Sequence, residues 1–171
     1  MTAKPIGTLA IILLLVACGS GLNQPPASQV SEAMRVLYRG IQCPATQAGI
    51  QIIRDADAWS EWQSQRQKMS FAAEKETANA APDLNFGQIS VIVISMGQRT
   101  TAGYSVDVAE GSVTLNGTTL TVNTVWQEPL AGAILAQVVT SPCVAITDSN
   151  TQYDSIKITN QNGDIVIEQS I

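Results

Sequence analysis

The most regular hydrophobic segment of the chain is Ile89 to Met96, with the sequence ISVIVISM. It is rich in β-branched residues and almost unbroken in hydrophobicity, which is typical of a strand covered on both faces. We therefore expect this segment to lie centrally in a sheet.

A first β-hairpin is predicted around Asn116-Gly117, a dipeptide that favours two-residue turns. A turn at these residues sets Leu115 opposite Thr118. Two residues further from the turn, Val113 then lies opposite Leu120. Because side chains alternate along a strand, the hairpin has one apolar and one polar face. The apolar face contains Val113, Leu115, Leu120 and Val122, and the polar face contains Ser112, Thr114, Thr119 and Thr121.

A second hairpin is predicted at Asn162-Gly163 by the same turn chemistry. It sets Ile158 opposite Ile167, with Ile156 and Ile165 beside them on the same face. On the reverse face it sets Lys157 opposite Glu168, which is a favourable cross-strand pair.

A single amphipathic helix is predicted to begin after Asp55 or Asp57, either of which can cap its first turn. Trp59 and Trp62 are three residues apart and share a face with Met69. An isolated amphipathic helix has to bury its apolar stripe, which favours a core role for the tryptophans. An aromatic platform for a ligand is the alternative.

Further strands are predicted at Ile134 to Val139 and Val144 to Thr147, divided by Ser141-Pro142. Many strands and one helix indicate an α+β, mainly β domain, in which the helix packs on a largely antiparallel sheet. Both a half-open barrel and a small sandwich fit this pattern.

The N-terminal segment is typical of a bacterial lipoprotein signal. Lys4 precedes an apolar run from Ile6 to Val16 of about 11 residues, too short for a membrane-spanning helix of about 20. The run ends in Leu15-Val16-Ala17-Cys18, which resembles the lipobox. We expect residues 1–17 to be removed and Cys18 to carry lipid. An ordinary signal peptide with a chance cysteine is the alternative.

Residues 18–30 are polar and small, with Pro25-Pro26, and are predicted to form a flexible tether. Residues 31–171 then form one globular domain. Removal of the signal leaves eight basic against fourteen acidic residues, a net charge of about −6 without a basic cluster. This charge makes nucleic acid a poor candidate partner, and only the lipid is expected to hold the protein at the membrane. Ser20 is not the aspartate that favours inner-membrane retention, so in a diderm the periplasmic face of the outer membrane is the expected location.

Two cysteines remain once Cys18 is committed to lipid, namely Cys43 and Cys143. In an exported chain, pairing into a disulfide is the favoured interpretation, and two separate buried thiols are the alternative. Neither cysteine has a second cysteine or a histidine at ligand spacing, so we expect no metal site and no cofactor.

Three runs resemble the C-terminal domain of the PrcB family over about residues 83–146. They are Asp83-Leu84-Asn85-Phe86, the run from Met96 to Val106 (MGQRTTAGYSV) and the run from Gln137 to Pro142 (QVVTSP). PrcB proteins are described as lipoprotein subunits of a surface protease complex. The resemblance implies an accessory role in which the chain binds an exported partner, such as a protease, and performs no chemistry of its own.

The loop from Gly97 to Ser105 is the candidate contact surface. It follows a very apolar strand with seven residues that lack a large apolar group, and then Tyr104. Arginine and tyrosine are common among residues that dominate binding energy, so Arg99, Thr100, Thr101 and Tyr104 are the candidate partner-binding residues. In the alternative, Gly97 and Gly103 serve only the strand connection and Tyr104 folds inward.

The chain contains no histidine, which removes Ser-His-Asp and Cys-His arrangements and histidine-based zinc sites. Gly103-Tyr104-Ser105-Val106-Asp107 misses the nucleophile elbow because it ends in aspartate. We therefore name no catalytic residue and expect a non-catalytic binding module. A protease-inhibitor-like module and an unconventional hydrolase remain the alternatives.

Replacement of the lipobox cysteine tests the anchor. Because each buried methylene of a lipid chain contributes about 0.8 kcal/mol, acylation at Cys18 should hold the mature protein in the membrane fraction. Cys18→Ser should release the protein or leave it as the uncleaved precursor, as judged by fractionation and intact mass. An unmodified Cys18 in protein purified from membranes would contradict the assignment.

Overall fold

The structure is a computed structural model and describes residues 34–69, 84–149 and 152–171. The predicted signal, Cys18, the tether and Asp83 lie outside the described residues. Within the described ranges, no helix is both long enough and apolar enough to cross a membrane.

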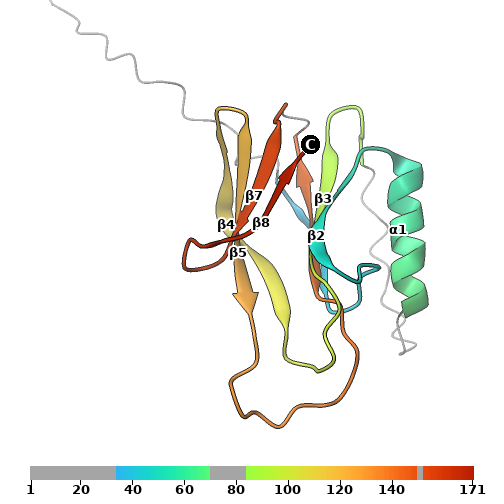
Figure 1. The fold of residues 1–171 in the computed structure, drawn as a ribbon. Coiled ribbons are helices and arrows are strands. Elements are labelled where there is room, and N and C mark those ends of the chain that lie inside the picture. Colours follow the sequence, from blue (N-terminus) through green and yellow to red (C-terminus); the bar gives the residue numbers. More distant parts are fainter. Residues whose placement is uncertain (1–33, 70–83, 150–151) are drawn as a thin grey trace, which may run out of the picture.

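The described chain forms a two-sheet sandwich with a helix on one outer face (Figure 1). The first sheet is antiparallel throughout, with the order β1 (Val36–Gly40), β6 (Cys143–Asp148), β3 (Ser90–Met96) and β2 (Ala48–Ile53). The second sheet has the order β4 (Ser105–Asn116), β5 (Thr119–Gln127), β7 (Ser155–Thr159) and β8 (Ile165–Ser170). Helix α1 (Ala56–Met69) covers the first sheet. These findings confirm the predicted α+β, mainly β class and correspond to the sandwich, since the sheets do not close into a barrel.

Strand β3 is central and covered on both faces, as its sequence predicts. Its side chains alternate between two cores. Val91 and Val93 pack towards α1, whereas Ile92, Ile94 and Met96 pack towards the second sheet. Strand β6, the neighbour of β3, is divided in the same way, with Ala145 on the helix side and Val144 and Ile146 between the sheets.

Helix α1 begins after Asp55, whose Oδ1 accepts a hydrogen bond of 2.7 Å from the Ala58 N–H. Trp59 and Trp62 are both buried, and their rings stack with centres 5.0 Å apart. Tyr38 of β1 meets the Trp62 ring edge-on at 5.6 Å. The tryptophans are therefore core residues that fix the helix to the first sheet.

The two cysteines lie in the core beneath α1 and are joined by the predicted disulfide, with Cα atoms 6.1 Å apart. The bond connects the segment between β1 and β2 to the first residue of β6, across 100 positions of sequence. A loop of that length corresponds to about 4.7 kcal/mol of stabilisation in the chain-entropy model.

The first hairpin has the predicted faces but not the predicted register. Leu115 pairs with Leu120, and Asn116 pairs with Thr119, so the turn residues are Gly117 and Thr118. Gly117 has φ of +61° and supplies the positive φ that the first position of a type II′ turn requires, while Asn116 stays in the strand. The observed pairing differs from the predicted pairing by two residues. Because side chains alternate with a period of two, the apolar face is preserved. Ser112 departs from the predicted polar face and is buried, because the register of β4 is irregular between Val108 and Val113.

The second hairpin has the predicted pairing. Ile158 pairs with Ile167, and Lys157 pairs with Glu168, whose carboxylate is 3.2 Å from the ammonium group. Ile156 and Ile158 are fully buried. Ile165, by contrast, is exposed, because the register shifts next to the turn, between Ile158 and Thr159.

The prediction of a strand at Ile134 to Val139 is wrong. These residues form an irregular, largely exposed stretch of the connection between β5 and β6. The Val138 N–H, for example, bonds locally to the Ala136 carbonyl rather than to another strand. β-Propensity reflects packing on a half-buried pleated surface, and this apolar run has no such surface to pack on. The second predicted strand, Val144 to Thr147, lies within β6.

At the end of β6, Asp148 is buried and its Oδ2 atom has no hydrogen-bond partner among the described residues. Burial raises the pKa of this carboxyl above its ordinary value of 3.8, although hydrogen bonds from Tyr153 and the Ser149 backbone oppose the shift. Burial, with the nearby Asp148 charge, also raises the pKa of Tyr153 to about 12. The ionised Asp148 therefore destabilises the fold at neutral pH.

Neutralising this carboxyl should stabilise the protein. The folded state holds its proton more tightly than the unfolded state, so wild-type stability falls as pH rises from about 3.8 through the raised pKa. Asp148→Asn should melt higher than wild type at pH 7, by about 2–4 °C for each kcal/mol gained, and this advantage should shrink towards pH 4. Asp154→Asn is the control, because it removes the same charge from an exposed residue. A lower melting temperature for Asp148→Asn at pH 7 would contradict the interpretation.

Candidate functional site

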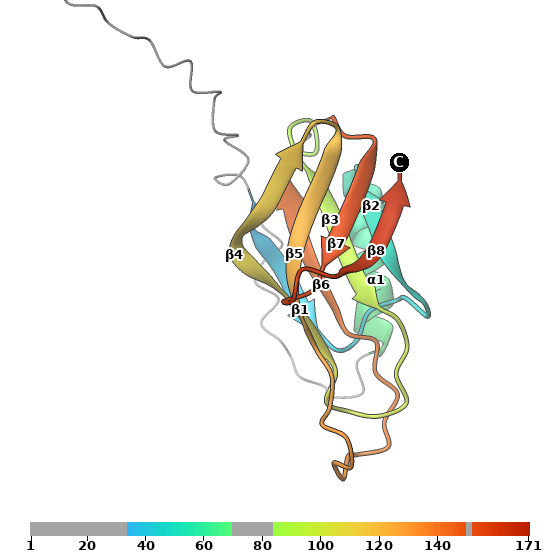
Figure 2. The ribbon, with the colours of Figure 1, turned by 60° about the vertical axis from the view of Figure 1, so that its left-hand side comes forward.

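Two loops project together from one end of the sandwich (Figures 1 and 2). The first, residues 97–104, joins β3 to β4 and contains most of the predicted contact surface. The second, residues 128–142, joins β5 to β6. We call them together the loop pair. They lie side by side because β3 and β6 are neighbours in the first sheet.

Hydrogen bonds join residues 99–102 of the first loop to residues 136–140 of the second. Arg99 and Thr140 exchange two bonds, of 2.7 and 2.9 Å, in an isolated antiparallel bridge. The Thr140 hydroxyl donates to the Thr101 carbonyl at 3.2 Å, and the Ala102 N–H donates to the Ala136 carbonyl at 3.1 Å. The loop pair is therefore a preformed arm rather than two independent loops.

Gly97 is required for this arrangement. Its φ is +73°, and a Cβ atom there would lie 2.5 Å from the Ala48 backbone nitrogen. Gly103 also has a positive φ, of +96°, and faces Pro129 of the second loop. For these two glycines the structural interpretation holds, because they allow the first loop to leave β3 and meet its neighbour.

Arg99 and Tyr104 lie against each other within the first loop. The guanidinium carbon of Arg99 is 5.2 Å from the centre of the Tyr104 ring, a cation–π distance. The Arg99 Nε atom is covered yet has no hydrogen-bond partner among the described residues. Tyr104 is half-buried and packs against the core between the sheets, so it combines a structural role with a surface-facing one. Thr100 is exposed, and Thr101 is half-buried and contributes its carbonyl.

The outermost part of the second loop exposes large apolar side chains that are not among the predicted contact residues. Leu130 is 85% exposed and Ile134 is fully exposed, at 103%. We call these two residues the apolar tip. Val138 and Val139 continue the exposed apolar surface towards the sandwich. The run from Leu130 to Val139 gave no distinguishing signal, because apolar residues in a β protein usually indicate a buried strand.

A cavity of about 330 Å³ lies at the base of the loop pair, next to the end of α1. Ile41, Met69 and Val139 provide its apolar lining, and Lys68 contributes a positive charge. Among the residues that the structure describes, no three histidine, cysteine or acidic side chains gather as a metal site would require.

The arrangement is suited to recognition. Exposed aliphatic side chains, a half-buried arginine and a tyrosine are found together on a hydrogen-bonded arm. Arginine and tyrosine are enriched among the residues that dominate binding energy, and the buried centres of interfaces are more apolar than the remaining surface. The predicted residues Arg99, Thr100, Thr101 and Tyr104 lie at one side of this arm, and the apolar tip lies beyond them.

The family model described as PrcB C-terminal matches residues 90–147. This segment is therefore similar to the PrcB C-terminal domain. In comparisons with curated proteins and with solved structures, no match to the chain was found.

The matched segment begins with β3 and ends within β6, and it includes the β4–β5 hairpin and both projecting loops. All four predicted contact residues and the apolar tip therefore belong to it. Helix α1 and strands β1, β2, β7 and β8 lie outside the matched residues and complete its two cores. The disulfide connects the matched segment to the residues before it, because Cys143 lies within the match and Cys43 lies before it.

Proposed function

We propose that this chain is a non-catalytic binding module of the cell envelope, anchored by lipid on Cys18, whose loop pair captures an exported protein partner such as a protease. The observation that carries the proposal is the exposed apolar tip on a preformed arm. Contiguous exposed apolar patches are uncommon on monomeric soluble proteins and usually mark interaction sites, and Val138 and Val139 extend the apolar tip towards the sandwich.

The hydrogen bonds between the loops favour binding. An arm that is already ordered loses less conformational entropy on association than two independent loops. Burial of each tip side chain in a partner contributes about 1.5–3 kcal/mol, and about 1.4 kcal/mol corresponds to a tenfold change in affinity. Arg99 adds a charged donor close to this apolar surface.

The position of the loop pair relative to the proposed tether also supports the assignment. The described chain starts next to β1, and Arg35 bonds to Thr147 near the end of β6. The loop pair lies at the other end of the first sheet, where β3 ends and β6 begins. The arm therefore points away from the end of the first sheet at which the described chain starts.

The same loop pair is consistent with a protease-inhibitor-like module, since a projecting loop can occupy a protease cleft. The two functions differ in their effect on the partner. An accessory subunit leaves the activity of a captured protease intact or increases it, whereas an inhibitor reduces that activity with a stoichiometry of one to one.

Capture of the partner tests the proposal. The full-length protein serves as bait in detergent-solubilised membranes of the source cell, and captured proteins are identified by mass spectrometry. Leu130→Ser with Ile134→Ser should reduce recovery of the main captured protein at least tenfold, and Arg99→Ala should reduce it several-fold. The variant with both tip substitutions should keep the wild-type melting temperature within about 2 °C, because substitutions of exposed residues usually change stability by less than about 0.5 kcal/mol.

Ile171→Ser is the matched control. It also removes an exposed isoleucine, but Ile171 follows β8 at the end of the sandwich opposite the loop pair. This variant should capture the partner at wild-type levels. If the tip variant and Arg99→Ala retain the partner as well as wild type does, the loop pair is not the contact surface.

A further inference from the structure

Strand β2 is an edge strand of the first sheet, because its one strand partner among the described residues is β3. The N–H and C=O groups along its other side therefore have no strand partner in the described part of the chain. Such an edge is a template for an additional strand, and proteins usually protect it with charges, prolines or irregular pairing.

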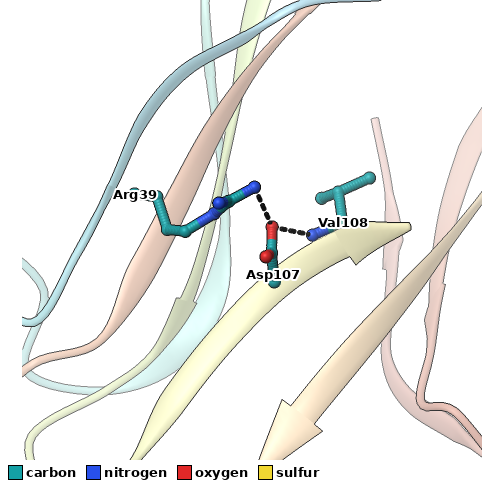
Figure 3. Close-up of polar contacts among 3 residues, drawn as sticks. All are labelled: Arg39, Asp107 and Val108. Carbon is teal, nitrogen blue, oxygen red and sulfur yellow. Dashed lines mark hydrogen bonds and ion pairs between the residues drawn. The ribbon is translucent and has the colours of Figure 1, made fainter. Parts of the chain in front are cut away.

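The other three edge strands carry such protection. Strand β1 has irregular pairing near Val36, and its Arg39 forms an ion pair of 2.6 Å with Asp107 of β4 (Figure 3). Strand β4 is irregular between Val108 and Val113, and Asp107 also accepts a hydrogen bond from the Val108 N–H. Strand β8 carries Glu168 and an irregular pairing near its turn.

Strand β2 has none of these features. Its sequence, Ala48 to Ile53 (AGIQII), contains no charge and no proline. It pairs with β3 over all six residues without a register shift. The unprotected edge is therefore specific to one strand, and it lies on a different part of the fold from the apolar tip.

A hollow of about 130 Å³ lies beside this edge on the helix side. Trp62 of α1 and Val93 and Ser95 of β3 contribute to its lining, and Gly49 of β2 leaves it open, since a Cβ atom there would meet nothing within 4 Å. No lining residue carries an ionisable side chain. An apolar cavity of about 150 Å³ accepts a benzene molecule, so this hollow is of the right size for one aliphatic side chain.

We propose that the outer edge of β2 binds an extended, uncharged peptide segment of a partner protein as a fifth strand of the first sheet. The unpaired backbone groups of β2 provide the hydrogen bonds, and the hollow beside Gly49 takes one aliphatic side chain of the segment. This is strand addition, in which the main chain supplies affinity and a pocket supplies selectivity. Charge complementarity selects a neutral segment, because the edge and the hollow contain no charge.

A second copy of the chain is a poorer occupant. A β2 strand from another molecule brings only Gly49, Gln51 and Ile53 on its helix-facing side. Ile53 is already buried, at 1% exposure, in its own core. The isoleucines at 50 and 52 pack towards the second sheet. No free aliphatic side chain remains on β2 to fill the hollow of a partner copy.

A panel of blocked seven-residue peptides tests the proposal. The peptides alternate threonine and valine and differ only at the central position, which is leucine, lysine or aspartate. Binding to the full-length protein is followed by tryptophan fluorescence, since Trp62 lines the hollow, and by amide exchange of β2. The leucine peptide should bind at least tenfold more tightly than the two charged peptides and should slow exchange along β2.

Two variants and a matched control locate the binding. Gly49→Leu fills the hollow and Gln51→Lys places a charge on the edge, so each should weaken binding of the leucine peptide at least tenfold while the melting temperature is kept. Gln67→Lys introduces the same charge on an exposed position of α1 and should leave binding unchanged. Failure of all three peptides to bind, or unchanged binding to Gly49→Leu, would overturn the proposal.

Two further outcomes are equally decisive. Concentration-dependent dimerisation of the wild-type protein that Gln51→Lys abolishes would replace the partner segment with a second copy. Slow exchange of every β2 amide in the protein without peptide would show that the chain itself already covers the edge. The inference does not rest on the loop pair, because Gly49→Leu leaves the apolar tip unchanged and should retain any partner captured there.

Discussion

The burial of the β3–β6 pair on both faces is the constraint on which the rest of the structure depends. The helix-side core and the core between the sheets meet at these two strands, and Cys143 attaches β6 covalently to the segment before β2. Strands buried on both sides cannot slip by one residue without moving every side chain into the opposite core. Their register is therefore fixed, and so is the point at which each projecting loop leaves the sandwich.

The segment that matches the PrcB C-terminal model contains this buried strand pair. The match runs from the first residue of β3 to the last part of β6, so it includes the rigid pair and the two loops that the pair holds together. The flanking elements supply what the matched segment lacks, namely Trp59 and Trp62 over one face and Ile156 and Ile158 against the other. They also supply β2, so the edge proposed for strand addition lies outside the matched residues, whereas the loop pair lies within them.

Much of the fold could be predicted because local chemistry and tertiary packing agree. The ISVIVISM run, the Asn162-Gly163 turn and the spacing of Trp59 and Trp62 each indicate the element that forms. The predicted hairpin register failed at Asn116-Gly117, because a turn at Gly117-Thr118 satisfies the same local preferences almost equally well. The predicted strand failed at Ile134 to Val139, because packing overrides β-propensity there. The parallel pairing of β5 with β7 also gave no local signal, because it arises from β6 entering the other sheet between them. For the site, Arg99 and Tyr104 were accessible to sequence reasoning, whereas Leu130 and Ile134 were not, since an exposed aliphatic residue has the same sequence signature as a buried one.

The central claim is that the two loops form one ordered arm before any partner binds. Residue-resolved amide hydrogen exchange of the free protein tests it most directly, because the N–H groups of Arg99, Ala102 and Thr140 donate across the loop pair. The account predicts that these three amides exchange at least about a hundredfold more slowly than the same residues in an unstructured peptide. Exchange of all three at the unstructured rate would show that the arm is not formed in the free protein and would contradict the account.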